Sequence, residues 1–268
     1  MHVERFESAL WQTTSLLVVA DGEAVVLDPC IDSAEVARLD VRARELGARV
    51  THVLATHADW DHVCGIAAFP DAVATMGELT AQAVESGAPA DVIVKRAVEY
   101  GLEVPGAPRV DRALAVGVAH RVGPFTVETL ALPGHKPDGT AFRVRALGLL
   151  AVGDYLSSVE FPFVSSTADY RMTLAGLIDL LRHDPPDQVV PGHGPPHTAA
   201  EALAIAEADL DYLRELRAAV AGAIEGGADG VRARKAGLLI DPPRPASDGL
   251  DDMRIANVET QLAELLPH

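Results

Sequence analysis

Two imidazoles and two carboxylates crowd into six consecutive positions of this 268-residue chain, in the segment Thr56-His57-Ala58-Asp59-Trp60-Asp61-His62. The segment directly follows the apolar run 50–55, which predicts a strand. Burying ionisable groups at this density costs free energy unless they are paired or coordinate a metal. We therefore predict a metal-binding loop at the end of a strand.

Three more potential ligands follow predicted strands, and each stands directly after a glycine: His135, Asp154 and His193. Glycine lets the backbone of two segments approach closely, and the end of a strand places a side chain rigidly. We expect these three side chains to converge with the 57–62 segment.

The rest of the chain alternates between strands and helices. Apolar runs and an Asp21-Gly22 turn predict strands at 15–20, 23–28, 49–55, 125–132, 141–152 and 188–190. Apolar spacing and capping residues predict helices at 34–46, 63–69, 169–183, 198–224 and 251–266, with two more inside 78–100. Residues 101–118 are expected to be loop with one strand, and 226–249 a polar stretch. This order predicts an α/β fold with a sheet-on-sheet core and outer helices.

Composition excludes several functional classes. A net charge of -17 argues against a nucleic-acid partner, because phosphate binding needs a basic surface. Apolar runs such as 147–152 are far shorter than the ~20 residues that span a bilayer. The amino terminus has no apolar targeting segment. We expect a soluble, cytoplasmic protein that acts on a small molecule, without a nucleic-acid or membrane partner.

The order of these motifs resembles the metallo-β-lactamase-fold metallo-hydrolases. Their signature His-x-His-x-Asp-His is followed by a Gly-His, a Gly-Asp and a second Gly-His, and the match runs from Ser15 to about Pro196. The resemblance implies a four-layer αββα sandwich with a metal site at one edge of the two sheets. We predict a catalytic domain at 1–197 and a helical extension at 198–268, packed on the same domain. That extension is expected to add to the core, cap the site or form the seam of a homodimer.

The resemblance also implies a hydrolase that binds two divalent metal ions, with zinc as the favoured metal. The implied ligands are His57, Asp59 and His135 for one ion, Asp61, His62 and His193 for the other, and Asp154 between them. A hydroxide bridging the two ions would attack an ester-like bond. Asp61 would orient it and move its proton, and Tyr155 would hydrogen-bond a carbonyl oxygen or an oxyanion.

Asp59 departs from the superfamily pattern, which has histidine there. A third carboxylate makes the site a weaker Lewis acid and favours harder metals such as iron or manganese. With a carboxylate at this position, the motif also resembles that of the flavodiiron proteins, whose sequence there is His-x-Glu-x-Asp-His. No flavodoxin-like pattern follows residue 196, however. Three hypotheses stay open: a metal-dependent hydrolase, a di-iron redox protein, and a metal-poor binding module without catalysis.

The set of ligands does not select a substrate. The absence of a secretion signal disfavours a secreted β-lactamase, and the negative charge disfavours a nuclease. A lactone or a thioester is therefore favoured over a β-lactam or a phosphodiester. Four side chains near the ligands are candidate substrate contacts, each with a plain packing or solvent-exposed alternative: Trp60, Lys136, Phe161 and Phe163.

Overall fold

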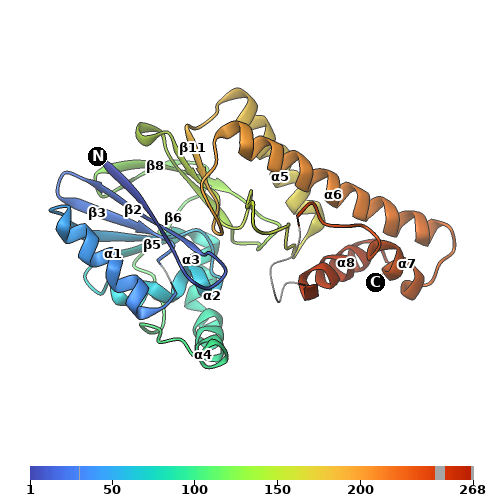
Figure 1. Cartoon of the computed structure of the whole chain (residues 1–268), viewed down its shortest axis with the longest axis horizontal. Coiled ribbons are helices and arrows are strands. Elements are labelled where there is room, and N and C mark those ends of the chain that lie inside the picture. The colour runs from blue at the N-terminus through green and yellow to red at the C-terminus, as the bar shows by residue number, and fades with distance from the viewer. Residues whose placement is uncertain (30, 245–250, 267–268) are drawn as a thin grey trace.

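Two β-sheets packed face to face form the centre of the molecule (Figure 1), in a computed structural model that describes residues 1–29, 31–244 and 251–266. The first sheet contains, in spatial order, β1 (His2–Glu7), β2 (Thr14–Ala20), β3 (Glu23–Leu27), β4 (Arg49–Ala55), β5 (Val73–Gly77) and β6 (Arg112–Leu114). The second contains β11 (Gln188–Val190), β10 (Leu149–Ala151), β9 (Thr140–Val144), β8 (Phe125–Ala131) and β7 (Ala119–Val122). Strands β3 to β6 pair in parallel, as do β10 and β11, and the other neighbours are antiparallel.

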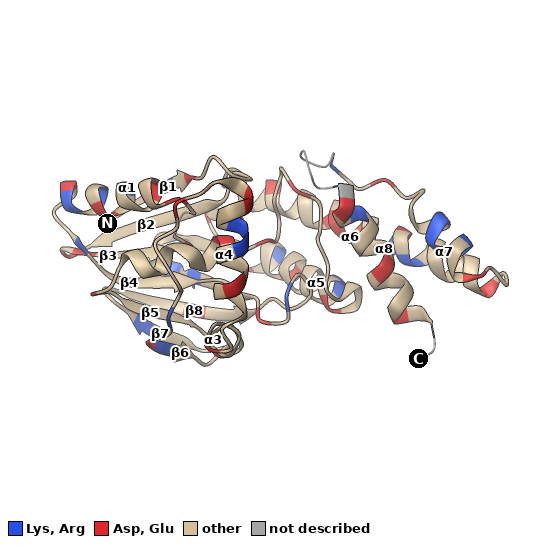
Figure 2. Ribbon diagram, turned by 90° about the horizontal axis from the view of Figure 1, so that it is seen from below, with Lys and Arg blue, Asp and Glu red and all other residues tan. Residues whose placement is uncertain are grey.

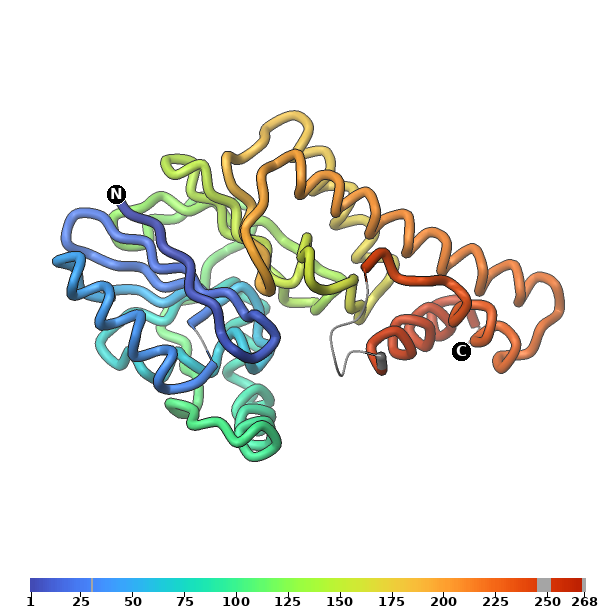
Figure 3. The backbone as a smooth tube through the Cα atoms, viewed as in Figure 1, coloured from blue at the N-terminus to red at the C-terminus, as the bar shows by residue number. Residues whose placement is uncertain are grey.

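Helices cover the outer face of each sheet. The first sheet carries α1 (Ser33–Glu45), α2 (Trp60–Val63), α3 (Glu78–Glu85) and α4 (Ala88–Tyr100). The second carries α5 (Thr167–His183) and α6 (Ala199–Glu225), with α7 (Gly230–Gly237) and α8 (Asp251–Leu265) packed on α6. Figure 3 shows these C-terminal helices, coloured orange to red, extending beyond the sheets at the end opposite α1.

Three apolar cores lie between the layers. Because side chains alternate along a strand, Leu16 and Val18 of β2 join the core between the sheets, while Leu17 and Val19 join the core beneath α1. A third core joins β10 and β11 to α5 and α6. Burial on both faces explains the continuous apolar run of β2. The αββα sandwich expected from the sequence is confirmed.

The strands predicted at 15–20, 23–28, 49–55, 125–132 and 188–190 are confirmed. The run 141–152 is two strands, because a 3₁₀ turn (Arg145–Leu147) and Gly148 at φ 59° reverse the chain between β9 and β10. Strands β1, β5 and β7 and helix α7 were not predicted. In β1 charged side chains alternate poorly with apolar ones, and β5 is short and contains Ala74 and Gly77, which have low strand propensity.

The helix expected at 63–69 begins earlier, at Trp60, and continues as a 3₁₀ helix over Cys64–Ala68. Asp61 and His62 therefore lie on its first turn rather than in a loop. Asp59 occupies the N-cap position, with an extended backbone, but its side chain makes no capping hydrogen bond. The carboxylate of Asp59 is thus directed to other partners.

Helix α6 starts at Ala199, where the sequence placed the start of a helical extension. Thr198 and Glu201 form a capping box, in which each side chain accepts from the other residue's backbone N–H. The division into 1–197 and 198–268 stays a prediction, as does the homodimer seam.

Within the described residues, no helix is long and apolar enough to cross a membrane. Figure 2 shows acidic and basic residues spread over the outer helices and loops, with the strands mostly uncharged.

Candidate metal centre

The seven predicted ligands converge where the ends of β4, β10 and β11 meet. The loop after β4, helix α2, the β8–β9 loop and the segments after β10 and β11 supply them. They form two groups, and inside each group the potential ligand atoms all lie within 4.8 Å of one another. One group is His57, Asp59, His135 and Asp154, and the other is Asp61, His62 and His193. Segments far apart in the chain thus share one site.

Asp154 stands between two pairs of histidines. Its Oδ2 lies 3.5 Å from His57 Nε2 and 3.2 Å from His135 Nε2. Its Oδ1 lies 3.1 Å from His62 Nε2 and 3.4 Å from His193 Nε2. One carboxylate oxygen therefore faces each pair, which is the arrangement of a ligand shared by two ions.

A second carboxylate completes each group. Asp59 Oδ2 lies 3.7 Å from His57 Nε2 and 3.4 Å from His135 Nε2. Asp61 Oδ2 is similarly placed, 3.5 Å from the Nε2 of His62 and 3.4 Å from that of His193. Ligands held about 2.0–2.1 Å from a tetrahedral metal lie roughly 3.3–3.4 Å apart. The spacing within each group matches that requirement.

Several of these buried atoms have no hydrogen-bond partner among the described residues: the Nε2 atoms of His57, His62 and His135, and Oδ1 of Asp154. Leaving a buried polar atom unsatisfied costs about 1–3 kcal/mol. The atoms approach one another closely without hydrogen-bond geometry, as ligands that converge on a cation do. The donor set therefore suits two divalent metal ions.

Each histidine is oriented by a partner on its other ring nitrogen. The Nδ1 partners are Thr56 Oγ1 for His57 at 3.1 Å, Asp28 Oδ2 for His62 at 3.1 Å, Phe163 O for His135 at 2.9 Å and Trp11 O for His193 at 3.0 Å. Such partners fix the ring and the tautomer of a metal-binding histidine. They turn all four Nε2 atoms toward the centre.

Asp28 is a site residue that the sequence analysis missed. It is buried, with a φ of 47°, and its carboxylate accepts from Thr56 N and Thr56 Oγ1, both at 2.7 Å, as well as facing His62. It thus braces the loop that carries the ligands. Asp28 closes an apolar strand just as Asp154 does, so the same pattern could have found it.

Tyr155 lies beneath the turn that carries His135. Its hydroxyl donates to Pro133 O at 2.6 Å and accepts from His135 N at 3.2 Å, and its side chain is buried. Burial raises the pKa of the phenol well above its usual value. These contacts make Tyr155 a positioning residue for the turn, and its expected contact with a substrate oxygen stays a prediction.

Lys136 pairs with Asp59. Its Nζ lies 2.8 Å from Asp59 Oδ1, while Oδ2 of the same carboxylate faces His57 and His135. Both side chains are about one-third exposed (39% and 30%), so solvent screens the pair in part. Three carboxylates and one ammonium carry the same formal charge as the two carboxylates of the superfamily pattern. The extra negative charge expected from Asp59 is therefore offset.

The aromatic candidates for substrate contact are mostly packed inside. Trp60 is buried and stacks on Tyr100, with ring centroids 6.2 Å apart and planes at 8°. Phe161 is also buried, with its ring edge-on to Phe163 at 4.9 Å and to Tyr212 at 6.3 Å. The packing explanation thus holds for Trp60, and Phe161 belongs to the core rather than to a pocket lip.

Burial and neighbouring charges act in opposite directions on the site histidines. Burial lowers the pKa of His135, but the carboxylates of Asp154 and Asp59 outweigh it and raise the pKa to about 10. Burial also lowers the pKa of His193, yet Asp154 and Glu160 raise it to about 9. In the metal-free protein both rings are therefore protonated at neutral pH, so metal binding must displace protons.

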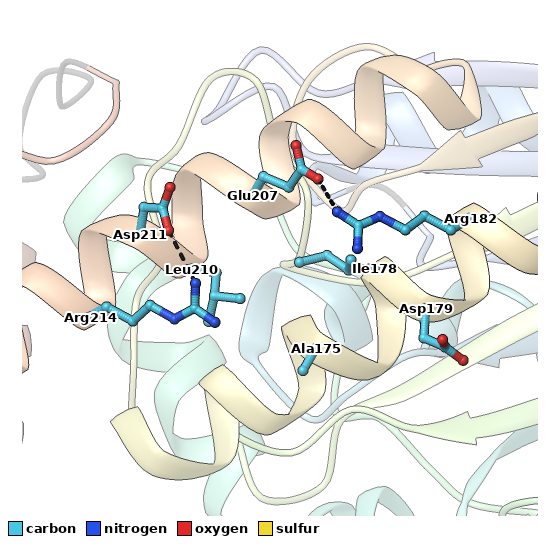
Figure 4. A pocket seen from close by; sticks show the side chains of 8 residues that line it. All are labelled: Ala175, Ile178, Asp179, Arg182, Glu207, Leu210, Asp211 and Arg214. Carbon is cyan, nitrogen blue, oxygen red and sulfur yellow. Dashed lines mark hydrogen bonds and ion pairs between the residues drawn. The ribbon is translucent and has the colours of Figure 1, made fainter.

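A cavity lies away from the metal centre, between α5 and α6 (Figure 4). Its volume is about 500 Å³. Ion pairs on its wall join Arg182 to Glu207 at 2.5 Å and Arg214 to Asp211 at 3.3 Å. Because both arginines are paired with carboxylates, this groove presents no concentrated positive charge to an anionic ligand.

The chain belongs to the metallo-beta-lactamase superfamily, whose family model matches residues 9–212. It is 25% identical over 189 residues to "Probable metallo-hydrolase YqgX" of Bacillus subtilis, covering 69% of this chain and 86% of that protein. It is 31% identical over 140 residues to hydroxyacylglutathione hydrolase of Cereibacter sphaeroides, covering 52% of this chain and 46% of that protein.

Two solved structures extend the likeness. TTHA1429 of Thermus thermophilus, a metallo-beta-lactamase family protein, superposes with a TM-score of 0.70 at 18% identity, covering 98% of this chain and 92% of that one. TTHA1623 in a di-iron-bound form superposes with a TM-score of 0.57 at 27% identity, covering 74% and 96%. The first likeness shows that the shared fold extends over the C-terminal helices.

Gly192 gives the first test of the centre. An added Cβ there would clash with Asp154 Oδ1 and lie 2.8 Å from His62 Cε1. We expect Gly192→Ala to weaken zinc binding at least about tenfold, as measured by chelator competition. Gly176→Ala in α5 is the control, because nothing lies within 4 Å of its added Cβ. Unchanged zinc affinity in Gly192→Ala would contradict the assigned geometry.

The pH dependence of metal binding is a second test. The raised pKa values of His135 and His193 stabilise the metal-free fold fully below the ordinary histidine pKa of 6.5, and this contribution is lost as the pH rises through 9–10. Zinc-loaded protein has no such protons to lose. We expect the increase in Tm caused by zinc to grow from about pH 6.5 to about pH 9, with protons released on binding. A pH-independent increase would refute this assignment.

The Asp59–Lys136 pair makes a third prediction. In Asp59→His the lysine is left unpaired beside two cations, so we expect zinc affinity to fall about tenfold although the superfamily pattern is restored. Asp59→His combined with Lys136→Met should recover most of that loss. Dissociation constants for the wild type, both single variants and the double variant would measure the coupling. Equal affinities of Asp59→His and the double variant would rule it out.

Proposed function

We propose that this protein is a dinuclear metal-dependent hydrolase that cleaves an ester-like bond in a small molecule. The observation that carries the proposal is the placement of Asp154, with one oxygen toward each of two histidine pairs. Membership of the superfamily and two relatives named as hydrolases support it.

The two groups of ligands would hold two divalent ions, and zinc is the metal that we favour. Ions bound there would act as Lewis acids on the scissile carbonyl and make water acidic enough to attack at neutral pH. Asp61 lies beside His62 and His193 and is 5% exposed, so its carboxylate can orient the attacking water and accept its proton. Tyr155 and Asp28 hold the backbone that places the ligands.

An acyl thioester or a lactone is the substrate class that we favour. The relative at 31% identity is named for hydrolysis of hydroxyacylglutathione, an acylated thiol. The likeness covers only about half of each chain, so it supports the bond type rather than a particular molecule.

Iron is the second candidate metal. The carboxylate of Asp59 adds a hard oxygen ligand, and the TTHA1623 structure at 27% identity is a di-iron-bound form. The charge of Lys136 beside Asp59 works against this preference, because it withdraws part of the carboxylate's negative charge. Metal analysis of protein purified without added metal distinguishes the two: two zincs favour the hydrolase and two irons favour a redox protein.

A substrate panel tests the proposal. Protein reconstituted separately with zinc, manganese and iron is assayed on an acyl thioester, a lactone, a β-lactam and a phosphodiester. We expect thioester or lactone hydrolysis that a chelator abolishes, and a loss of about 10²–10⁴-fold in kcat in Asp61→Asn. The exposed His183→Ala is the control. Protein that binds two metal ions yet hydrolyses none of the four substrates would overturn the hydrolase, and protein that binds no metal would favour a binding module.

A further inference from the structure

Asn257, in the C-terminal helix α8, is fully buried and uses both ends of its side-chain amide. Its Oδ1 accepts from Val164 N at 3.1 Å, and its Nδ2 donates to Pro162 O at 2.6 Å. These two partners flank Phe163 in the segment between β10 and α5. One side chain thus holds the backbone on both sides of a single residue.

Phe163 is the residue that orients a metal ligand. Its carbonyl oxygen lies 2.9 Å from His135 Nδ1. Because a carbonyl oxygen only accepts, Nδ1 carries the hydrogen and Nε2 is directed at Asp59 and Asp154. The position of this carbonyl therefore sets the tilt and the tautomer of the His135 ring.

Regular secondary structure does not hold this carbonyl in place. Residues 157–166 belong to no helix or strand, so their buried peptide groups need partners elsewhere. Asparagine is suited to this role, because its amide carries a donor and an acceptor like those of a peptide group. Thr260 of α8 adds a hydrogen bond from its hydroxyl to Val164 O at 3.3 Å.

The same segment also holds the backbone just before His135. Ser165 N and Ser166 N donate to Gly134 O at 2.8 and 3.1 Å. The His135 turn is therefore fixed at its ring and at its backbone by one segment, and α8 fixes that segment. An apolar residue at position 257 would pack equally well but would leave two peptide groups of the segment unsatisfied.

We propose that Asn257 is a positioning residue of the metal centre, which acts on His135 through the carbonyl of Phe163. Helix α8 is then part of the machinery that sets metal affinity, although it supplies no ligand. The inference rests on the proposed function only in that the centre binds metal; it does not depend on the substrate.

The test compares two variants of α8. Asn257→Leu keeps a similar volume and removes the hydrogen bonds to Pro162 O and Val164 N, together with a longer one, 3.4 Å, from Nδ2 to the Tyr212 hydroxyl. Val258→Ala is the matched control, because Val258 is equally buried but faces Val220 and Gly237 rather than the 162–164 segment. We expect Asn257→Leu to weaken zinc binding about 10–100-fold relative to Val258→Ala. Zinc dissociation constants are measured by chelator competition at a temperature where both variants are folded.

A spectroscopic measurement separates positioning from simple loss of stability. The visible absorption of cobalt(II)-loaded protein reports ligand geometry, and we expect it to change in Asn257→Leu but not in Val258→Ala. If Asn257→Leu fails to fold, Thr260→Val removes one hydrogen bond from the same segment and should shift both measurements in the same direction. Equal zinc affinity and equal spectra in the two α8 variants would overturn the inference. Wild-type protein that binds no zinc would instead refute the proposed function.

Discussion

One carboxylate shared between two pairs of imidazoles is the interaction on which the site depends. Asp154 is placed by the end of β10, and each of its oxygens is within 3.5 Å of two histidine Nε2 atoms. The sandwich makes this possible because its two sheets are joined at the same edge, where Thr140 N donates to Thr56 O at 2.8 Å and Thr14 N donates to Gly192 O at 2.7 Å. A side chain at position 192 would occupy the space of the shared carboxylate. The ends of the strands and the chemistry of the centre therefore constrain one another.

The candidate ligands were easier to predict from the sequence than the groups that hold those ligands in place. Four of the candidate ligands fall in one short segment and three follow glycines at strand ends, so residue type and spacing indicated which side chains would converge. Their division between two ions came from the resemblance. The carbonyls that orient His135 and His193 belong to Phe163 and Trp11, and a backbone carbonyl leaves no trace in residue type. Asp28 did carry a signal, but a single acid after a strand is common. Strand β5 was missed because it is short and because Ala74 and Gly77, which have low strand propensity, weaken the signal of Val73 and Thr75.

The electrostatics of the centre also depended on the fold. From the sequence, Asp59 alone implied an additional negative charge at the centre. In the structure one oxygen of Asp59 faces the histidines and the other faces Lys136, which follows ligand His135 directly in the chain. Adjacency to a ligand did not reveal this pair, because Lys136 could equally have extended into solvent from the turn. The substitution of a histidine by an aspartate and the nearby lysine are therefore best treated as one electrostatic unit.

The C-terminal helix shows why a metal site at a sheet edge needs support from outside the sheets. Ligands at strand ends are carried by loops, and loops lack the ladder hydrogen bonds that fix a strand. In this protein the 162–164 segment meets that need through Asn257, whose amide substitutes for a neighbouring strand on both sides of Phe163. If helix α8 served only to enlarge the core, an apolar side chain at position 257 would be sufficient. Burying an amide there costs desolvation, which is offset only because both of its ends are satisfied. The hydrogen bonds of this buried amide therefore link helix α8 to the orientation of His135.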